Sequence, residues 1–196
     1  MANTFKTWKD LPKLTTAGFT VIDCPAEIWT KILAVYELTK QNPHIENFVN
    51  KKDIIEGGNP EWNSEIYRLD FYPERSKQLH NLLQPMHEEW VGRKLIKQNI
   101  YGIRSYLDKT SLIMHRDRVG THHVSSIIHV DQDITKPWPL HIEDHEGKEH
   151  LIYTEPGQII LYESATCIHG RPTQFEGKYY RNFYVHYRLQ DWQFAG

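Results

Sequence analysis

Apolar residues recur at helical spacing in two segments of the first half of the chain, residues 26–40 and 75–95. Apolar side chains three and four positions apart lie on one face of a helix, so both segments are predicted to be amphipathic helices. The Asn42-Pro43 pair is expected to end the first helix. Residues 44–73 carry several glycines and prolines and are expected to be irregular, with one short strand at most.

From residue 99 onward the pattern changes to short apolar runs separated by turn signals. Many short strands at even spacing are typical of a β-sandwich or a closed roll. The runs predict eight strands, at residues 100–107, 113–118, 122–132, 138–143, 149–154, 158–163, 165–169 and 178–190.

The two patterns together predict an α+β fold that is mainly β. We expect a single domain over residues 1–196, in which residues 1–98 form a helical and irregular support region and residues 99–191 form the β core. The chain contains no internal repeat or low-complexity tract that would indicate a second domain.

Composition narrows the class of protein. Aromatic residues make up 12% of the 196 residues and charged residues 24%, which is typical of a globular protein. The formal net charge of −2 gives no reason to expect a nucleic-acid partner. Two cysteines, Cys24 and Cys167, are too few for a disulfide scaffold or a cysteine zinc site. Residues 1–13 lack the apolar run of a signal peptide, and no segment is long enough to cross a bilayer, so a soluble cytoplasmic protein with no membrane partner is expected.

The candidate chemistry is carried by His115-Arg116-Asp117 and by His169, which follows 54 residues after His115. Residues i and i+2 of a strand face the same way, so His115 and Asp117 can point inward together. A later strand must then bring His169 beside them. Two imidazoles and one carboxylate form the facial triad that holds iron(II) with open coordination positions.

Other histidines also stand two residues before an acid, so the triplet alone is a weak signal. His87 falls in a predicted helix, where i and i+2 point apart. His44 precedes the β region, and His141 adjoins a charged turn. The adjacent Arg116 and Arg118 would explain a surface strand with local ion pairs, and only the combination with His169 favours a metal site.

From residue 100 to residue 189 the chain resembles the 2-oxoglutarate and iron(II)-dependent oxygenases, and among them the prolyl 4-hydroxylase-like branch. That branch has a tyrosine nine residues before its H-x-D, a distal histidine, and a basic residue nine or ten positions further on. These positions hold Tyr106, His115 with Asp117, His169 and Lys178. The resemblance implies a double-stranded β-helix, or jelly roll, backed by the N-terminal helices.

The same resemblance implies the reaction and its cofactors. Iron(II), 2-oxoglutarate and dioxygen, with ascorbate in support, would hydroxylate an unactivated C–H bond and release succinate from the cosubstrate. The ligands implied for the metal are His115, Asp117 and His169.

The far carboxylate of a buried 2-oxoglutarate needs a charge partner. Lys178 is the expected cation, and Arg181 is the alternative because arginine offers bidentate geometry. If Lys178 faces inward, strand alternation turns a polar set inward with it, namely Tyr180, Asn182, Tyr184 and His186. If Arg181 faces inward, so do residues that look suited to packing against the helices.

Two further residues are expected near the cosubstrate. His129 lies where related enzymes place a tyrosine that reaches the far carboxylate, although a core histidine bonded to a neighbouring backbone is an equally good interpretation. Tyr106 is expected to line the pocket on its spacing from His115. Asn182, Tyr184 and His186 would line it from the last long strand.

The resemblance implies a prolyl residue in a peptide or protein as substrate. Aromatic residues within 42–75 could form a groove for an extended peptide, and Arg116 and Arg118 could sit at the pocket mouth. Three alternatives stay open: the same chemistry on a free amino acid or small metabolite, a non-catalytic cupin-like binding or sensing module, and a zinc hydrolase.

Overall fold

The computed structural model describes residues 3–46 and 62–195. In these ranges the chain is mostly β, with two α-helices, α1 (Ala26–Thr39) and α2 (Pro73–Val91), and one short 3-10 helix at Trp8–Asp10. The strands are β1 (Asn3–Phe5), β2 (Phe19–Asp23), β3 (His44–Glu46), β4 (Ser64–Arg68), β5 (Leu95–Lys97), β6 (Gly102–Tyr106), β7 (Leu112–His115), β8 (Val124–Ile134), β9 (Leu140–Glu143), β10 (Glu149–Ile152), β11 (Gln158–Tyr162), β12 (His169–Arg171), β13 (Gly177–Leu189) and β14 (Trp192–Phe194).

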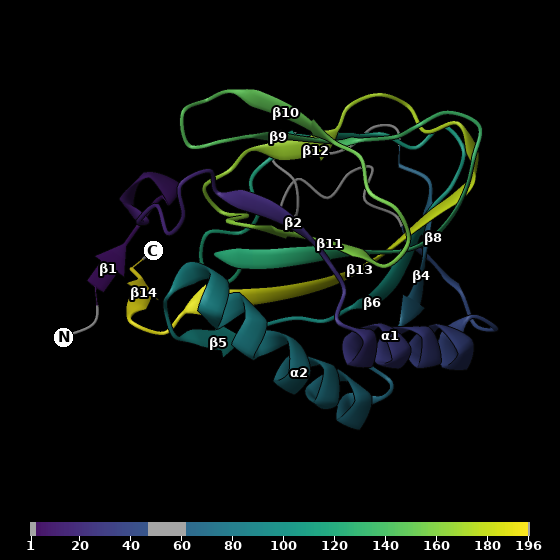
Figure 1. The fold of residues 1–196 in the computed structure, drawn as a ribbon, viewed down its shortest axis with the longest axis horizontal. Coiled ribbons are helices and arrows are strands. Elements are labelled where there is room, and N and C mark those ends of the chain that lie inside the picture. The colour runs from purple at the N-terminus through teal and green to yellow at the C-terminus, as the bar shows by residue number, and fades with distance from the viewer. Residues whose placement is uncertain (1–2, 47–61, 196) are drawn as a thin grey trace.

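Two antiparallel sheets face each other. The larger one has eight strands in the order β2-β11-β8-β13-β6-β4-β3, with β5 also pairing with β13. The smaller one has four strands in the order β10-β9-β12-β7. Figure 1 shows the large sheet lying between the small sheet and the two helices. A pair of short parallel strands, β1 and β14, joins the two ends of the chain.

The helices cover one face of the large sheet. Their buried apolar side chains pack with those of β8, β11 and β13 in a single cluster, in which Ile32, Leu83 and Phe183 are fully buried. Burying each side chain of this size stabilises the fold by roughly 1.5–3 kcal/mol. The other face of the same sheet is left to form one wall of the space between the sheets.

The two predicted helices are confirmed. α1 ends one residue before its predicted end. α2 begins at Pro73, two residues before the predicted start, and ends at Val91, with Gly92 as the residue that follows the helix. Proline suits the first turn of a helix because its missing N–H has no partner there, and Gly92 adopts the left-handed conformation that ends many helices. The predicted second helix is therefore too long at its end, because the chain beyond Gly92 enters β5.

All eight predicted strands have a counterpart with bounds shifted by one or more residues, and two of these shifts affect the candidate site. β7 stops at His115, so Asp117 follows the strand, and β12 begins at His169 and not at residue 165. The first half also contributes more strand than expected, because β2, β3, β4 and β5 all join the large sheet. The expectation of one short strand at most within residues 44–73 is wrong.

Within the described residues, neither helix combines the length and the apolar character needed to span a membrane.

Buried histidines make the fold sensitive to acid. His87 is fully buried on α2 with its Nδ1 bonded to the carbonyl of Leu83 at 2.8 Å, and burial lowers its pKa from 6.5 to about 4. Burial likewise lowers the pKa values of His80 and His123 to about 4. The unfolded chain takes up protons on these imidazoles as the pH falls below about 6.5, whereas the folded protein does so only near pH 4. The free energy of unfolding that these neutral imidazoles contribute is therefore fully present above pH 6.5. This contribution is lost as the pH falls from 6.5 to 4.

We predict that His87→Phe removes one proton from this linkage. The slope of unfolding free energy against pH should fall by up to about 1.4 kcal/mol per pH unit across that window. Urea denaturation of the metal-free protein at several pH values measures the slope. Gln78→Ala, at an exposed position of the same helix, removes no titratable group and is the control that should leave the slope unchanged. An unaltered slope in the His87 variant would contradict this explanation of acid sensitivity.

Candidate metal and cosubstrate site

Strands β7 and β12 of the small sheet bring the two histidines together. His115 and His169 are directly opposed in the antiparallel pair. A Cβ atom at Gly170 would lie only 2.6 Å from the carbonyl oxygen of Ile113, so only glycine lets the two strands approach this closely. The next residues of the chain after β7 then place Asp117 beside both rings.

The three side chains form a compact group. His115 Nε2 lies 3.7 Å from Asp117 Oδ1, and His169 Nε2 lies 3.8 Å from the same oxygen. One ligand atom from each residue falls within 4.8 Å of the others. Among the described residues this is the one such group, and His44, His87, His129 and His141 take no part in it.

Backbone carbonyls orient both imidazoles. His115 Nδ1 donates to the carbonyl of Ile113 at 2.8 Å, and His169 Nδ1 donates to that of Cys167 at 2.9 Å. A carbonyl can only accept, so in each neutral ring Nδ1 carries the proton and Nε2 keeps its lone pair. The two lone pairs are therefore on the atoms that face Asp117.

Asp117 is held in its ionised form. Burial alone would raise the pKa of its carboxyl, but four surrounding histidines, His169, His186, His122 and His115, outweigh burial and lower it to about 2. Burial lowers the pKa of His169 to about 4. At neutral pH the group thus offers one carboxylate and an unprotonated His169, which are the forms that bind a metal. Asp117 Oδ2 is buried and has no hydrogen-bond partner among the described residues.

A chain of hydroxyl groups fixes His186 next to Asp117. Ser164 donates to the carbonyl of His122 at 2.9 Å, so Ser125 must donate to Ser164 at 2.6 Å. His186 Nδ1 must then donate to Ser125 at 2.7 Å. Its ring packs against that of His122 with centroids 4.0 Å apart and the ring planes tilted by 42°.

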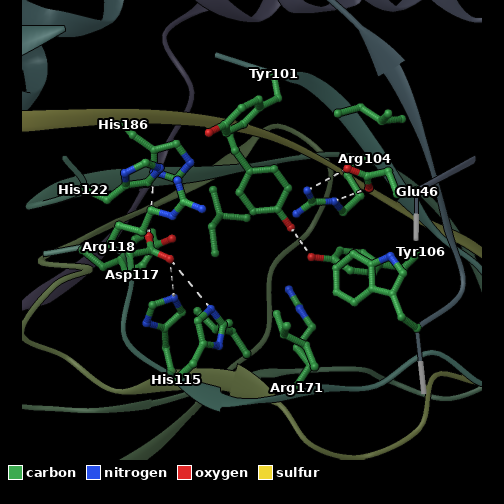
Figure 2. Close-up of a pocket in the computed structure, with 18 of the residues that line it drawn as sticks. Glu46, Tyr101, Arg104, Tyr106, His115, Asp117, Arg118, His122, Arg171 and His186 are labelled. Carbon is green, nitrogen blue, oxygen red and sulfur yellow. Dashed lines mark hydrogen bonds and ion pairs between the residues drawn. The ribbon is translucent and has the colours of Figure 1, made fainter. Parts of the chain in front are cut away.

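The triad opens into a cavity of about 220 Å³ between the two sheets. Figure 2 shows the metal group on one side of this pocket and Arg104, Glu46 and Tyr106 on the other. Arg104 makes a bidentate ion pair with Glu46, at 2.6 Å and 2.9 Å. The remaining wall includes Tyr101, Arg118, His122, Arg171, Tyr184 and His186.

Arg171 is the buried cation of this pocket. It stands two residues after His169 on β12, lines the same cavity as that ligand, and is 2% exposed. Its guanidinium lies over the rings of both Trp138 and Tyr180, 4.7 Å and 4.5 Å from their centroids, and donates to the carbonyl of Trp138. Among the described residues no carboxylate pairs with it.

Two tyrosine hydroxyls face the same cavity. Those of Tyr106 and Tyr184 lie 2.8 Å apart, and the amide of Asn182 donates to Tyr184 at 3.3 Å. Only one of the two hydroxyl protons can bridge the pair. The other is left to donate elsewhere, so the pair can serve an acceptor in the pocket.

The prediction that Lys178 faces the pocket is wrong. Its side chain is 81% exposed and pairs with Asp133 at 2.9 Å. The inward alternation does hold for the other residues of the polar set. Tyr184 and His186 line the cavity, Tyr180 packs with Tyr106 on the same side of the strand, and Asn182 bonds to Tyr184. The alternation fails at Lys178 because the pairing of β13 with β8 shifts register between Gly177 and Tyr179.

The alternative cation, Arg181, also lies outside the pocket. It pairs with Asp131 at 3.1 Å and packs over the rings of Tyr36, Tyr67 and Tyr179 on the helix-facing side of the sheet. The interpretation that this side of β13 packs against the helices is confirmed by Phe183, Val185 and Tyr187.

The remaining predicted site residues divide between the pocket and its surroundings. His129 is buried behind the cavity wall, where its Nδ1 donates to the carbonyl of Thr154 at 2.8 Å, so its Nε2 is an acceptor and cannot donate to a carboxylate. Arg116 bonds to the carbonyl of Thr166 and lies over the ring of Trp8, away from the pocket, whereas Arg118 lines it. The predictions for His129 and Arg116 as contact residues are therefore wrong.

The aromatic groove expected within 42–75 is only partly described, because residues 47–61 lie outside the described ranges. Trp62 lines the cavity, but Tyr67 is buried against Tyr36 of α1, with ring centroids 5.8 Å apart. Phe71 is exposed beside His44.

Sequence reasoning missed Arg171, Arg104 and Glu46 as pocket residues. For Arg171 a signal existed, since it stands two positions after His169. The predicted strand ends at residue 169, so Arg171 falls outside it. Glu46 on β3 and Arg104 on β6 lie far apart in the sequence, and no local motif links them. They meet because both strands pair with β4 in the large sheet.

Comparisons with known proteins rest on structure. No protein-family model matches the chain, and no curated protein matches it. A 2OG-Fe(II) oxygenase family oxidoreductase from Burkholderia pseudomallei is similar over 100% of both chains, with 12% identity and a TM-score of 0.68. A prolyl-4-hydroxylase from Pseudomonas putida is similar over 90% of this chain and 95% of its own, with 14% identity and a TM-score of 0.58.

A third structure, HygX from Streptomyces hygroscopicus, contains nickel, 2-oxoglutarate and hygromycin B. It is similar over 91% of this chain and 85% of its own, with 12% identity and a TM-score of 0.62. The chain therefore has the fold of the 2-oxoglutarate and iron(II)-dependent oxygenases, a fold that it shares with prolyl hydroxylases.

Proposed function

We propose that this protein is a 2-oxoglutarate- and iron(II)-dependent dioxygenase built on a double-stranded β-helix. In this proposal His115, Asp117 and His169 hold the iron. The donor set fits that ion, because two imidazole nitrogens and one carboxylate oxygen suit iron(II) and leave positions open for other ligands. The buried Oδ2 of Asp117 accepts no hydrogen bond from the described residues and has His186 Nδ1 beside it, at 3.8 Å, which supports the proposal because a buried ionised oxygen is stabilised by a nearby cation.

The observation that supports the cosubstrate is that no carboxylate among the described residues pairs with the buried guanidinium of Arg171. A guanidinium that is 2% exposed cannot be neutralised by losing its proton, so burying it without a counter-ion is costly. A dicarboxylate such as 2-oxoglutarate supplies that counter-ion with one end while the other end reaches the metal group. We therefore assign the far carboxylate to Arg171, with the hydroxyl pair of Tyr106 and Tyr184 as a second donor.

When bound, iron(II), 2-oxoglutarate and dioxygen would supply the oxidising chemistry, in which the cosubstrate loses carbon dioxide to become succinate, and one oxygen atom of dioxygen enters succinate while the other converts an unactivated C–H bond into an alcohol. The chain's own residues orient the reactants. The carbonyls of Ile113 and Cys167 keep both ligand nitrogens unprotonated, and Arg171 fixes the direction of the cosubstrate. The two sheets surround the cavity and limit the access of water.

For the substrate, we propose a prolyl residue in a peptide or protein, on the spacing of Tyr106, His115 and His169. A free amino acid or small metabolite is the second candidate. It is favoured by the exposed position of Lys178, because the basic residue that completed the resemblance to the prolyl 4-hydroxylase branch lies outside the pocket. HygX, which has a similar fold, was solved with hygromycin B bound.

The first test is turnover of the cosubstrate. Purified protein supplied with iron(II), ascorbate and 2-oxoglutarate should form succinate slowly, and faster with a true substrate. His115→Ala and Asp117→Ala should abolish the activity, because each removes one of three proposed ligands. Lys136→Ala, at an exposed ion pair, is the matched control and should retain it. Succinate formation that survives loss of either ligand would rule out this site, and complete absence of turnover would favour a non-catalytic binding module.

The second test separates the candidate cations. Arg171→Gln should raise the KM for 2-oxoglutarate at least tenfold, because it removes a buried charge-assisted partner. Arg171→Lys should raise it less, since it keeps the charge but not the fork of donors. Lys178→Ala and Arg181→Gln should leave KM unchanged. Circular dichroism and metal affinity establish that each variant is folded. A normal KM in folded Arg171→Gln would show that another residue holds the carboxylate.

A further inference from the structure

A buried carboxylate outside the pocket, that of Glu163, lies between the N-terminal segment and the three proposed ligands His115, Asp117 and His169. Glu163 is 1% exposed and follows β11. Its Oε2 accepts the backbone N–H of Leu14 at 2.9 Å. Its Oε1 accepts the backbone N–H of Thr15 at 2.8 Å and the hydroxyl of Thr15 at 2.7 Å. His145 Nε2 lies 3.1 Å from the same oxygen.

The backbone completes this junction. β2 pairs antiparallel with β11, so that Phe19 opposes Tyr162, and Glu163 N–H then donates to the carbonyl of Gly18 at 2.8 Å. Gly18 N–H donates to the hydroxyl of Thr15 at 3.0 Å, and that hydroxyl donates to Glu163. Residues 14–18 are thus held to Glu163 through both its side chain and its main chain.

Glu163 also begins a tight turn, residues 163–167, which we call the Glu163 turn. Its carbonyl accepts the N–H groups of Thr166 and Cys167, at 3.0 Å and 2.9 Å, and the hydroxyl of Thr166 at 3.1 Å. The carbonyls that follow in this turn are thereby fixed in direction.

Those carbonyls support the metal group. The carbonyl of Ser164 accepts the N–H of Asp117 at 2.9 Å, and that of Cys167 accepts the Nδ1 proton of His169 at 2.9 Å. The carbonyl of Thr166 accepts from Arg116, the residue between the two ligands of the H-x-D triplet, at 3.0 Å. A turn of five residues therefore holds one proposed ligand by its backbone, another by its ring, and the link between His115 and Asp117.

We propose that Glu163 is a positioning residue for the metal site, which it serves by fastening the Glu163 turn to Leu14 and Thr15. This inference rests on the proposed function, since it concerns the same three ligands. The N-terminal segment before β2 becomes part of the support of the site, although it contributes no residue to the cavity wall. Outer partners of metal ligands commonly change metal affinity 10–100-fold when they are altered.

Glu163→Gln is the test variant. It keeps the shape and volume of the side chain, and its one remaining oxygen can still accept from Thr15, but its N–H₂ then opposes the backbone N–H of Leu14, so the fastening is weakened. Cobalt(II) alone is the probe, because its visible absorption reports the number and arrangement of its ligands. We expect the affinity for cobalt(II) to fall at least tenfold, with altered absorption bands, in a protein whose far-ultraviolet circular dichroism is that of the wild type.

Glu88→Gln is the matched control. Glu88 of α2 also accepts a backbone N–H, from Leu95 at 3.0 Å, and bonds to Gln84 and Lys94, at 2.9 Å and 2.6 Å, but it lies on the helical side of the large sheet. This variant should lose stability yet bind cobalt(II) with wild-type affinity and an unchanged spectrum. Thr15→Val, which removes one donor to Glu163, should weaken binding severalfold, and it decides the question if Glu163→Gln does not fold.

The outcomes are separable. If wild-type protein binds no cobalt(II), the proposed metal site and this inference both fail. If the wild type binds but the Glu163 and Thr15 variants match it in affinity and spectrum, only the inference fails. An equal loss of affinity in Glu88→Gln would reduce the role of Glu163 to general stability and would overturn it as well.

Discussion

The site depends on the close pairing of β7 with β12. Gly170 lets the two backbones approach until His115 and His169 oppose each other, and the chain that leaves β7 then has only one residue to cross before Asp117. A side chain at position 170 would meet the main chain of Leu112 and Ile113, which cannot move without disturbing the small sheet. The pairing of β7 with β12 therefore brings together three proposed ligands from two segments that are far apart in the sequence.

The second constraint on the pocket is the opposite charge of the buried groups at its two ends, Asp117 and Arg171. One side holds the Asp117 carboxylate surrounded by four histidines that lower its pKa, and the other holds the Arg171 guanidinium, which lies over two aromatic rings. Both ends lack a full partner within the described residues, and they face the same cavity. A divalent cation at one end and a carboxylate at the other satisfy both deficits, so the proposed cosubstrate complements the pocket at each end.

Much of this arrangement can be predicted from the sequence, and the failures have physical causes. Helical periodicity identified α1 and α2, and the triplet at His115 together with His169 identified the residues that the fold brings together. Alternation along β13 also placed Tyr184 and His186 at the cavity. The alternation failed at Lys178, where the pairing of β13 with β8 shifts register. Such a shift depends on both strands and cannot be recognised in the sequence of one strand alone. The pairing of Glu46 with Arg104, and the fastening of Glu163 by the N-terminal segment, likewise arise from contacts between distant segments.

The most direct measurement is an anaerobic titration of the iron(II)-loaded protein with 2-oxoglutarate, followed by visible absorption. A 2-keto acid that chelates iron(II) through its keto and carboxylate oxygens gives a charge-transfer band. The account predicts such a band, saturating at one iron and one 2-oxoglutarate per chain and missing in His169→Ala. Iron binding without any spectral response to 2-oxoglutarate would contradict it.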